Sequence, residues 1–103
     1  MSSLGKLVKQ ATRIQRQMEA VQEQLAGLTV EASSGGGVVK AVAKCNGTLS
    51  SIKIDPQVIN PSEPQLLEDL VLAAVNAALE KASEVSKAEM AKVTGGLPFP
   101  GLM

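Results

Sequence analysis

The hydrophobic positions of the N-terminal segment recur at alternating intervals of three and four residues. This spacing places them on one side of an α-helix, as the a and d positions of a heptad repeat. We therefore predict a helix over residues 4–28. At 1.5 Å per residue such a helix is about 37 Å long, so one small domain covers only part of it, and we expect the rest to protrude or pair. The positions are Leu4, Leu7, Ala11, Ile14, Met18, Val21, Leu25 and Leu28.

Between residues 29 and 55, β-branched and polar residues alternate, a pattern typical of half-buried strands. Glycines at 35–37 and the pair Asn46-Gly47 interrupt this alternation. Asn-Gly is the strongest two-residue hairpin signal. We predict a three-stranded antiparallel meander with strands at about 29–33, 38–45 and 48–55.

A two-residue loop at Asn46-Gly47 would fix which residues face each other in the hairpin. One face, predicted to be buried, would pair Val39 with Ile54, Ala41 with Ile52 and Ala43 with Ser50. Cys45 falls on this face and is interpreted as a small core residue. The opposite face would pair Lys40 with Lys53, Val42 with Ser51 and Lys44 with Leu49.

A second long helix is predicted over residues 63–93. Ser62 is expected to cap its first turn, with Gln65 reaching back. The first half of the helix is apolar on nearly all sides and is expected to be buried. Asn76 is interpreted as a buried hydrogen-bonding residue that fixes the helix against its sheet or against a second protomer. The second half keeps a narrow apolar stripe and is expected to project from the body.

These elements predict an α+β fold. Two long helices flank the antiparallel meander in the order α-β-β-β-α, as one domain over residues 1–94. Residues 95–103 are rich in Gly and Pro. We expect this tail to be disordered.

The composition excludes several classes of function. With no His and a single Cys, the chain lacks the usual zinc-binding sets, an internal disulfide and every histidine-based triad. We predict no metal, cofactor or catalytic residue, and an enzyme is the least supported class. With no Trp or Tyr and one Phe, the chain has no aromatic platform for unpaired bases, which favours duplex DNA over single strands.

Length and hydropathy bear on location and assembly. A chain of 103 residues leaves much of its surface unburied on its own, so we expect an oligomer. No apolar run approaches the roughly 20 residues of a membrane span, and the N-terminus lacks a signal-peptide pattern. We therefore expect no membrane partner and a cytoplasmic location.

The formal net charge is zero, but the charges are segregated along the chain. The first 18 residues carry four cations and no acid, residues 19–31 carry three acids, residues 40–53 carry three cations, and residues 55–69 carry four acids. The four N-terminal cations occupy c and f positions of the heptad, opposite the apolar seam. On pattern alone, a solvated helix face is the more common explanation, but the absence of mixed signs favours a stripe that follows phosphates. The stripe consists of Lys6, Lys9, Arg13 and Arg16.

A second basic cluster falls on the open face of the predicted hairpin, where Lys40 lies opposite Lys53 and Lys44 is nearby. Like charges placed opposite each other destabilise a sheet. A bound anion would relieve this repulsion, and so would a salt bridge to Glu31 on the neighbouring strand. The local salt bridge is the favoured interpretation, and the three lysines are secondary candidates for contacting DNA.

Two stretches are the most specific of the chain: "IDP" at residues 54–56 and, after a short acidic loop, "LEDLVLAAVNAA" at residues 67–78. With them, the chain resembles the YbaB/EbfC family of bacterial nucleoid-associated proteins over nearly its whole length. The resemblance implies an α-β-β-β-α protomer and a homodimer joined largely through the sheet region. Its projecting helices would hold duplex DNA like the arms of tweezers.

The resemblance also implies binding with limited sequence preference, and effects on nucleoid organisation and gene expression. The family's basic N-terminal helix corresponds to Lys6, Lys9, Arg13 and Arg16.

A helical adaptor or chaperone-like module is the alternative of a different class. Its two helices should form a coiled coil with each other. The second helix does not support this, because the frame that starts at Leu67 reaches Lys81 and Glu84. A protein partner between projecting helices stays open, because exposed Leu4, Leu7 and Ile14 need to be covered.

Overall fold

The computed structural model describes residues 2–94, and the predicted disordered tail lies outside the described residues. The elements are α1 (Ser2–Ala26), β1 (Thr29–Ser34), β2 (Val39–Lys44), β3 (Leu49–Ile54), a short 3-10 helix η1 (Pro56–Val58) and α2 (Pro64–Thr94). The strands form one antiparallel sheet in the order β1-β2-β3. The predicted α-β-β-β-α fold with its meander is confirmed.

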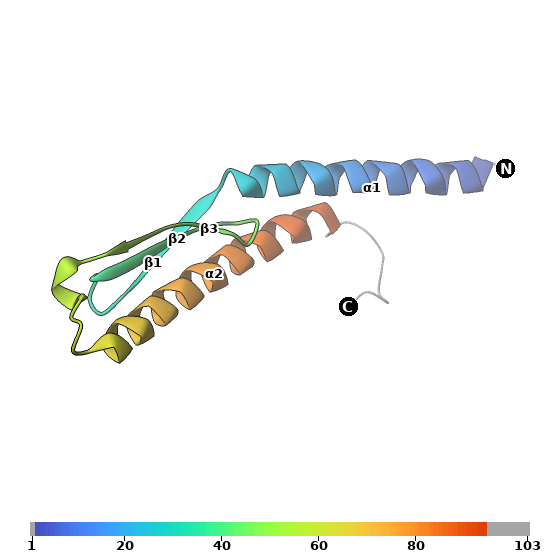
Figure 1. Ribbon diagram of the computed structural model, residues 1–103. Coiled ribbons are helices and arrows are strands. Elements are labelled where there is room, and N and C mark those ends of the chain that lie inside the picture. The colour runs from blue at the N-terminus through green and yellow to red at the C-terminus, as the bar shows by residue number, and fades with distance from the viewer. Residues whose placement is uncertain (1, 95–103) are drawn as a thin grey trace.

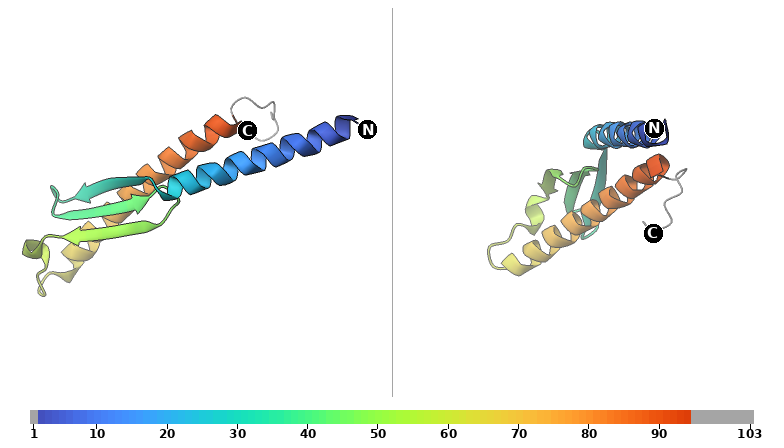
Figure 2. Two further views of the ribbon diagram at one scale, coloured as in Figure 1. Left: turned by 90° about the horizontal axis from the view of Figure 1, so that it is seen from above. Right: turned by 90° about the vertical axis from the view of Figure 1, so that its right-hand side faces the viewer.

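The molecule is elongated, measuring 72 × 25 × 17 Å along its principal axes. α2 crosses one face of the sheet, while α1 leaves the sheet where β1 begins and runs away from it (Figure 1). The N-terminal half of α1 extends past the end of α2 in both Figure 1 and the left view of Figure 2. The fold therefore has a two-layer body and one protruding helix.

α1 ends at Ala26, two residues before the predicted end. Gly27 donates its N–H to the carbonyl of Gln24, and Leu28 donates its N–H to the carbonyl of Leu25, both at 3.1 Å. These three-residue spacings tighten the last turn, as helix ends commonly do, and release the chain into β1. Leu28 consequently lies outside the helix.

The hairpin register matches the prediction over most of its length. Val39 pairs with Ile54, Lys40 with Lys53, Ala41 with Ile52 and Val42 with Ser51, but Ala43 pairs with Leu49 rather than Ser50. The predicted pairing near the loop is therefore wrong by one residue.

The loop itself explains the difference. Lys44 donates its N–H to the carbonyl of Thr48 at 2.7 Å, so the loop is the three residues Cys45–Gly47. Asn46 accepts hydrogen bonds from the Thr48 N–H and hydroxyl, a local arrangement that favours the longer loop. Gly47 has φ +98°, which a residue with a side chain rarely adopts. A bulge between Leu49 and Ser51 then restores the predicted register.

The core lies between α2 and the sheet and is built mainly from small residues. Since most of these are alanines, α2 approaches the sheet closely, and there is little room for a larger side chain. Cys45 is part of this core, as predicted. The buried residues are Leu25, Ala32, Val39, Ala41, Ala43, Cys45, Ala74, Ala78 and Ala82.

The turn between β1 and β2 fits tightly against α2. Ser34 donates its hydroxyl to the carbonyl of Leu70 at 2.6 Å. Gly35 has φ +61°, and a Cβ built there would lie 2.8 Å from Leu70 Cδ2 and 2.7 Å from Val38 Cγ2. Position 35 therefore needs glycine both for its backbone conformation and for space.

Burial departs from the sequence prediction in two places. On the β3 side of the predicted buried face, Ile52 is 43% exposed and Ile54 is half-buried, because α2 packs against β1 and β2. The first half of α2 is buried only on its sheet side, so Leu72 is 59% exposed and Asn76 is also exposed. The predictions that Asn76 is buried against its own sheet and that this half is buried all round are wrong for the protomer.

The two ends of α2 also differ from prediction. α2 begins at Pro64, and the Ser62 hydroxyl donates to Asn60 Oδ1 at 2.8 Å instead of capping the helix. Farther along, Ala82 is buried, Val85 packs against the core, and α2 contacts α1. The element that protrudes farthest is therefore α1 rather than the second half of α2 (Figure 1).

Candidate nucleic-acid interface

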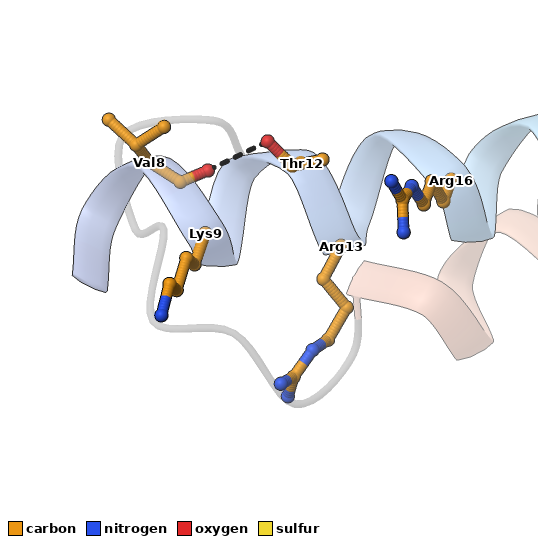
Figure 3. Close-up of a pocket in the computed structure, with 5 residues that line it drawn as sticks. All are labelled: Val8, Lys9, Thr12, Arg13 and Arg16. Carbon is orange, nitrogen blue, oxygen red and sulfur yellow. Dashed lines mark hydrogen bonds between the residues drawn. The ribbon is translucent and has the colours of Figure 1, made fainter. Parts of the chain in front are cut away.

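The four cations of the basic stripe lie on the exposed face of α1. Successive residues of an α-helix are rotated by about 100°, so these positions share an arc of about 80° that faces away from the apolar seam. All four side chains are exposed. Lys9 and Arg13 project to the same side of the helix in Figure 3. The residues are Lys6, Lys9, Arg13 and Arg16.

None of these four side chains has an ion pair or hydrogen bond within residues 2–94. Their charges are therefore not compensated by a carboxylate of the described chain. Lys9, Arg13 and Arg16 line a hollow on α1 together with two residues that sequence reasoning did not select, Val8 and Thr12 (Figure 3). Thr12 is not a free polar group, because its hydroxyl donates to the carbonyl of Val8 at 2.9 Å.

The basic stripe has a defined length. From Lys6 to Arg16 it covers ten residues, about 15 Å along the helix axis. Glu23 occupies the next f position on the same line, and Glu19 is one turn after Arg16. The same helix face therefore changes from cationic to anionic halfway along α1.

The second basic cluster lies on the open face of the sheet, opposite α2. Lys40 and Lys53 are direct partners in the ladder, and both are exposed. They line an open hollow of about 330 Å³ that also includes Asp55. One carboxylate oxygen of Asp55 already accepts the N–H of Gln57 at 2.9 Å.

The favoured interpretation of this cluster, a salt bridge to Glu31, is wrong. Glu31 lies opposite Val42, on the same face, but neither Lys40, Lys44 nor Lys53 forms an ion pair with it. Within residues 2–94, the ion pair that forms joins Lys92 to Glu89 at 3.1 Å. Among the described residues, no ion pair therefore relieves the repulsion between Lys40 and Lys53.

The basic stripe lies far from Lys40 and Lys53, whereas Lys44 pairs with Thr29 at the end of the sheet nearest α1. The turn that joins β1 to β2, next to Lys40, is at the opposite end of the sheet from α1 (Figure 1). The N-terminal half of α1 is farther still from that turn (Figure 2). The chain therefore presents the basic stripe and the pair Lys40 and Lys53 as two separate cationic surfaces.

The described residues contain neither a metal-binding cluster nor a membrane-spanning helix. No group of three or more His, Cys, Asp or Glu side chains there is placed to hold a metal ion. None of the helices there is both long enough and apolar enough to cross a membrane.

By its architecture, the chain falls in the class of small α+β proteins, and its protruding helix carries an exposed cationic face. Comparison with known proteins makes the class specific. The sequence model of the YbaB/EbfC DNA-binding family matches residues 1–97. The chain therefore belongs to this family, as its resemblance predicted.

Relatives agree with this assignment, and a solved structure agrees with the fold. A nucleoid-associated protein from Acetivibrio thermocellus is 52% identical over 101 residues, covering 97% of this chain and 89% of the relative. Another from Thermoanaerobacter pseudethanolicus is 50% identical over 100 residues, covering 97% and 90%. The crystal structure of an uncharacterized protein from Helicobacter pylori matches with a TM-score of 0.71 at 20% identity, covering 85% of this chain and 89% of that one, which supports the fold.

Proposed function

We propose that this chain is a homodimeric nucleoid-associated protein of the cytoplasm that binds duplex DNA with little sequence specificity. Its role is to influence nucleoid organisation and gene expression. The proposal rests mainly on the basic stripe of α1, whose four exposed cations have no partner among residues 2–94. It assigns no catalytic step to the chain, in keeping with the family and with the names of its relatives.

The dimensions of the basic stripe suit a phosphate backbone. One DNA strand carries a phosphate about every 3.4 Å along the axis, so a stripe of about 15 Å spans about four phosphates. Contacts of Lys and Arg with phosphates position a protein on the duplex but carry no sequence information. Low sequence specificity follows, since the charged groups of the stripe are its main binding groups.

Exposed apolar side chains around the sheet support a homodimer. Leu49 and Ile52 on β3 are 40% and 43% exposed, and Ile59, just after η1, is 53% exposed. These side chains lie where α2 does not cover the protomer, and a second copy would remove them from water. A homodimer joined through this region would carry eight stripe charges on two protruding helices.

We further propose that Lys40, Lys44 and Lys53 form a second phosphate contact. If so, Lys40→Gln with Lys53→Gln should raise the stability of the free protein by about 0.5 kcal/mol, because two facing like charges are removed. The same double variant should lower the salt dependence of DNA binding by about two units of slope for each engaged protomer. Thermal denaturation and a binding titration over a salt series measure the two effects.

Lys44→Gln is the matched control for the repulsion, because it removes a charge from the same face but not from the facing pair. It should leave the stability of the free protein unchanged. A double variant that becomes more stable and keeps the wild-type affinity and salt slope would remove the sheet lysines from the DNA interface.

The direct test of the proposed function is binding to two unrelated duplexes of equal length over a salt series. We expect both duplexes to bind alike. The basic stripe should contribute about −4 to the slope of log K against log salt if one stripe engages and about −7 if both do, and any sheet lysines that contact phosphates make the slope steeper. Sedimentation of the free protein should give the mass of two copies.

The absence of binding at low salt would contradict the proposal. The stripe would then be a solvated helix face, and the helical adaptor with a protein partner between the projecting helices would become the leading function. A large affinity difference between the two duplexes would contradict low specificity alone.

A further inference from the structure

The tip of the hairpin between β2 and β3 combines an exposed asparagine with the following residue that makes its amide most reactive. Asn46 and Gly47 are both exposed. An asparagine loses its amide when the backbone nitrogen of the next residue attacks the side-chain Cγ, and a side chain on that next residue hinders the attack. Gly47 has no side chain, so this hindrance is absent. Asn46 is therefore chemically predisposed to lose its amide.

The hydrogen bonds of the loop oppose this reaction. Asn46 Oδ1 accepts the Thr48 hydroxyl at 2.7 Å and the Thr48 N–H at 3.2 Å, which holds the amide side chain beside Thr48. Gly47 donates its N–H to the Lys44 carbonyl at 3.0 Å, and its nitrogen can attack only after losing that proton. Because these bonds lie in an exposed loop, they open locally at a small cost in free energy. The loop therefore slows the reaction without preventing it.

The other two asparagines of the chain lack this combination. Asn60 precedes Pro61, and proline has no N–H that could ionise. Asn76 precedes Ala77 in the interior of α2, where backbone N–H groups are held in the helical hydrogen-bond ladder. The chain thus contains two internal controls for the reactivity of Asn46.

We propose that Asn46 is a site of spontaneous deamidation in the native protein, controlled by opening of the hairpin tip. The Gly47 nitrogen gives its proton to water and attacks Asn46 Cγ. The Cγ–Nδ2 bond breaks, Nδ2 takes up a proton and leaves as ammonia, and a succinimide ring remains. Water then adds to either carbonyl of the ring, and the ring opens to aspartate or isoaspartate. The reaction consumes only water, and the inference does not depend on DNA binding.

Both products change the hairpin tip. Each adds a carboxylate two residues from Lys44, which offsets the positive charge there. An aspartate can still accept the two hydrogen bonds from Thr48, so it preserves the loop. An isoaspartate carries the main chain through the former side chain, which lengthens the loop and removes the acceptor from its place beside Thr48. The two products should therefore differ in their effect on the hairpin.

Incubation of the folded, full-length protein in mildly alkaline buffer tests the proposal. Peptide mapping by mass spectrometry measures the conversion at each asparagine, and an isoaspartate-specific methyltransferase detects the isoaspartate product. We expect Asn46 to be converted at least about tenfold faster than Asn76, and Asn60 to stay intact. Conversion of Asn46 at the rate of Asn76 would overturn the proposal. Conversion that occurs in urea-unfolded protein but not in folded protein would overturn it as well.

A threonine variant tests whether the loop controls the rate. Thr48→Val keeps the shape of the side chain but removes the hydroxyl that donates to Asn46. Loss of this exposed hydrogen bond should speed the conversion of Asn46 by about threefold to tenfold. Thr12→Val is the matched control, because it removes an exposed hydroxyl hydrogen bond on α1 and should leave the rate unchanged. Circular dichroism verifies that both variants are folded. An unchanged rate in Thr48→Val, or the same increase in both variants, would overturn control by the loop.

Discussion

Reversing the charges of Arg13 and Arg16 together, as Arg13→Glu with Arg16→Glu, should weaken binding to duplex DNA by about 100-fold or more at low salt. Two phosphate contacts of each basic stripe are lost, and two acids then face the phosphates. The loss should be the same on unrelated sequences, because phosphate contacts do not read bases. Titration of two labelled duplexes at several salt concentrations measures it. An unchanged affinity would exclude the stripe from the interface.

A matched pair of milder variants separates the effect of losing charge on α1 from the effect of the net charge of the protein on DNA binding. Arg13→Gln with Arg16→Gln lowers the net charge by the same amount as Gln65→Glu with Ser83→Glu, which adds acids at two exposed positions of α2. We expect the variant that loses Arg13 and Arg16 to have a salt slope reduced by about two for each engaged helix. The control variant, which gains two acids elsewhere, should keep nearly the wild-type slope. Equal effects would mean that net charge alone governs binding.

Leu25→Ala should produce the largest loss of stability of any single change proposed for this chain. Leu25 is one of the two large side chains that are fully buried, and it anchors α1 to the alanine-lined core. Removing a buried leucine side chain costs about 3 kcal/mol, and a domain of this size then melts about 10–20 °C lower. Thermal denaturation followed by circular dichroism measures the change.

Leu28→Ala is the control for this prediction. Leu28 belongs to the same heptad series, but it lies beyond the end of α1 and is 37% exposed. Its truncation should cost less than about 1 kcal/mol, since little buried surface is lost. Its carbonyl, which accepts the Cys45 N–H at 2.9 Å, is unchanged by the substitution. Equal losses for the two leucines would contradict the placement of α1 on the core.

Local signals were sufficient to predict the order of elements. The three-and-four spacing of α1, the alternation of the strands and the Asn46-Gly47 turn each act over a few residues, so a pattern along the chain reports them. The register from Val39 to Val42 followed from the same turn. The one-residue error near the loop arose because hydrogen bonds from Thr48 to Asn46 favour a longer loop than the dipeptide alone indicates.

The candidate site was predictable where it depends on a single helix. Lys6, Lys9, Arg13 and Arg16 share a face because of helical geometry alone, and their exposure follows from the protrusion of α1. Whether the charges of Lys40 and Lys53 are neutralised was not predictable in this way. Whether Glu31 neutralises them depends on side-chain distances across three strands, and the described structure has no such ion pair.

The fold class, the family and the cationic face of α1 follow from the order of the amino acids, because periodicity and charge order are properties of the chain. Which apolar residues are covered depends instead on how the elements pack together. α2 packs against β1 and β2, which leaves Ile52 on β3 exposed, and α2 is buried only on its sheet side, which leaves Leu72 and Asn76 exposed. Burial depends on which surfaces meet in space, and hydrophobic periodicity specifies a face without specifying its partner.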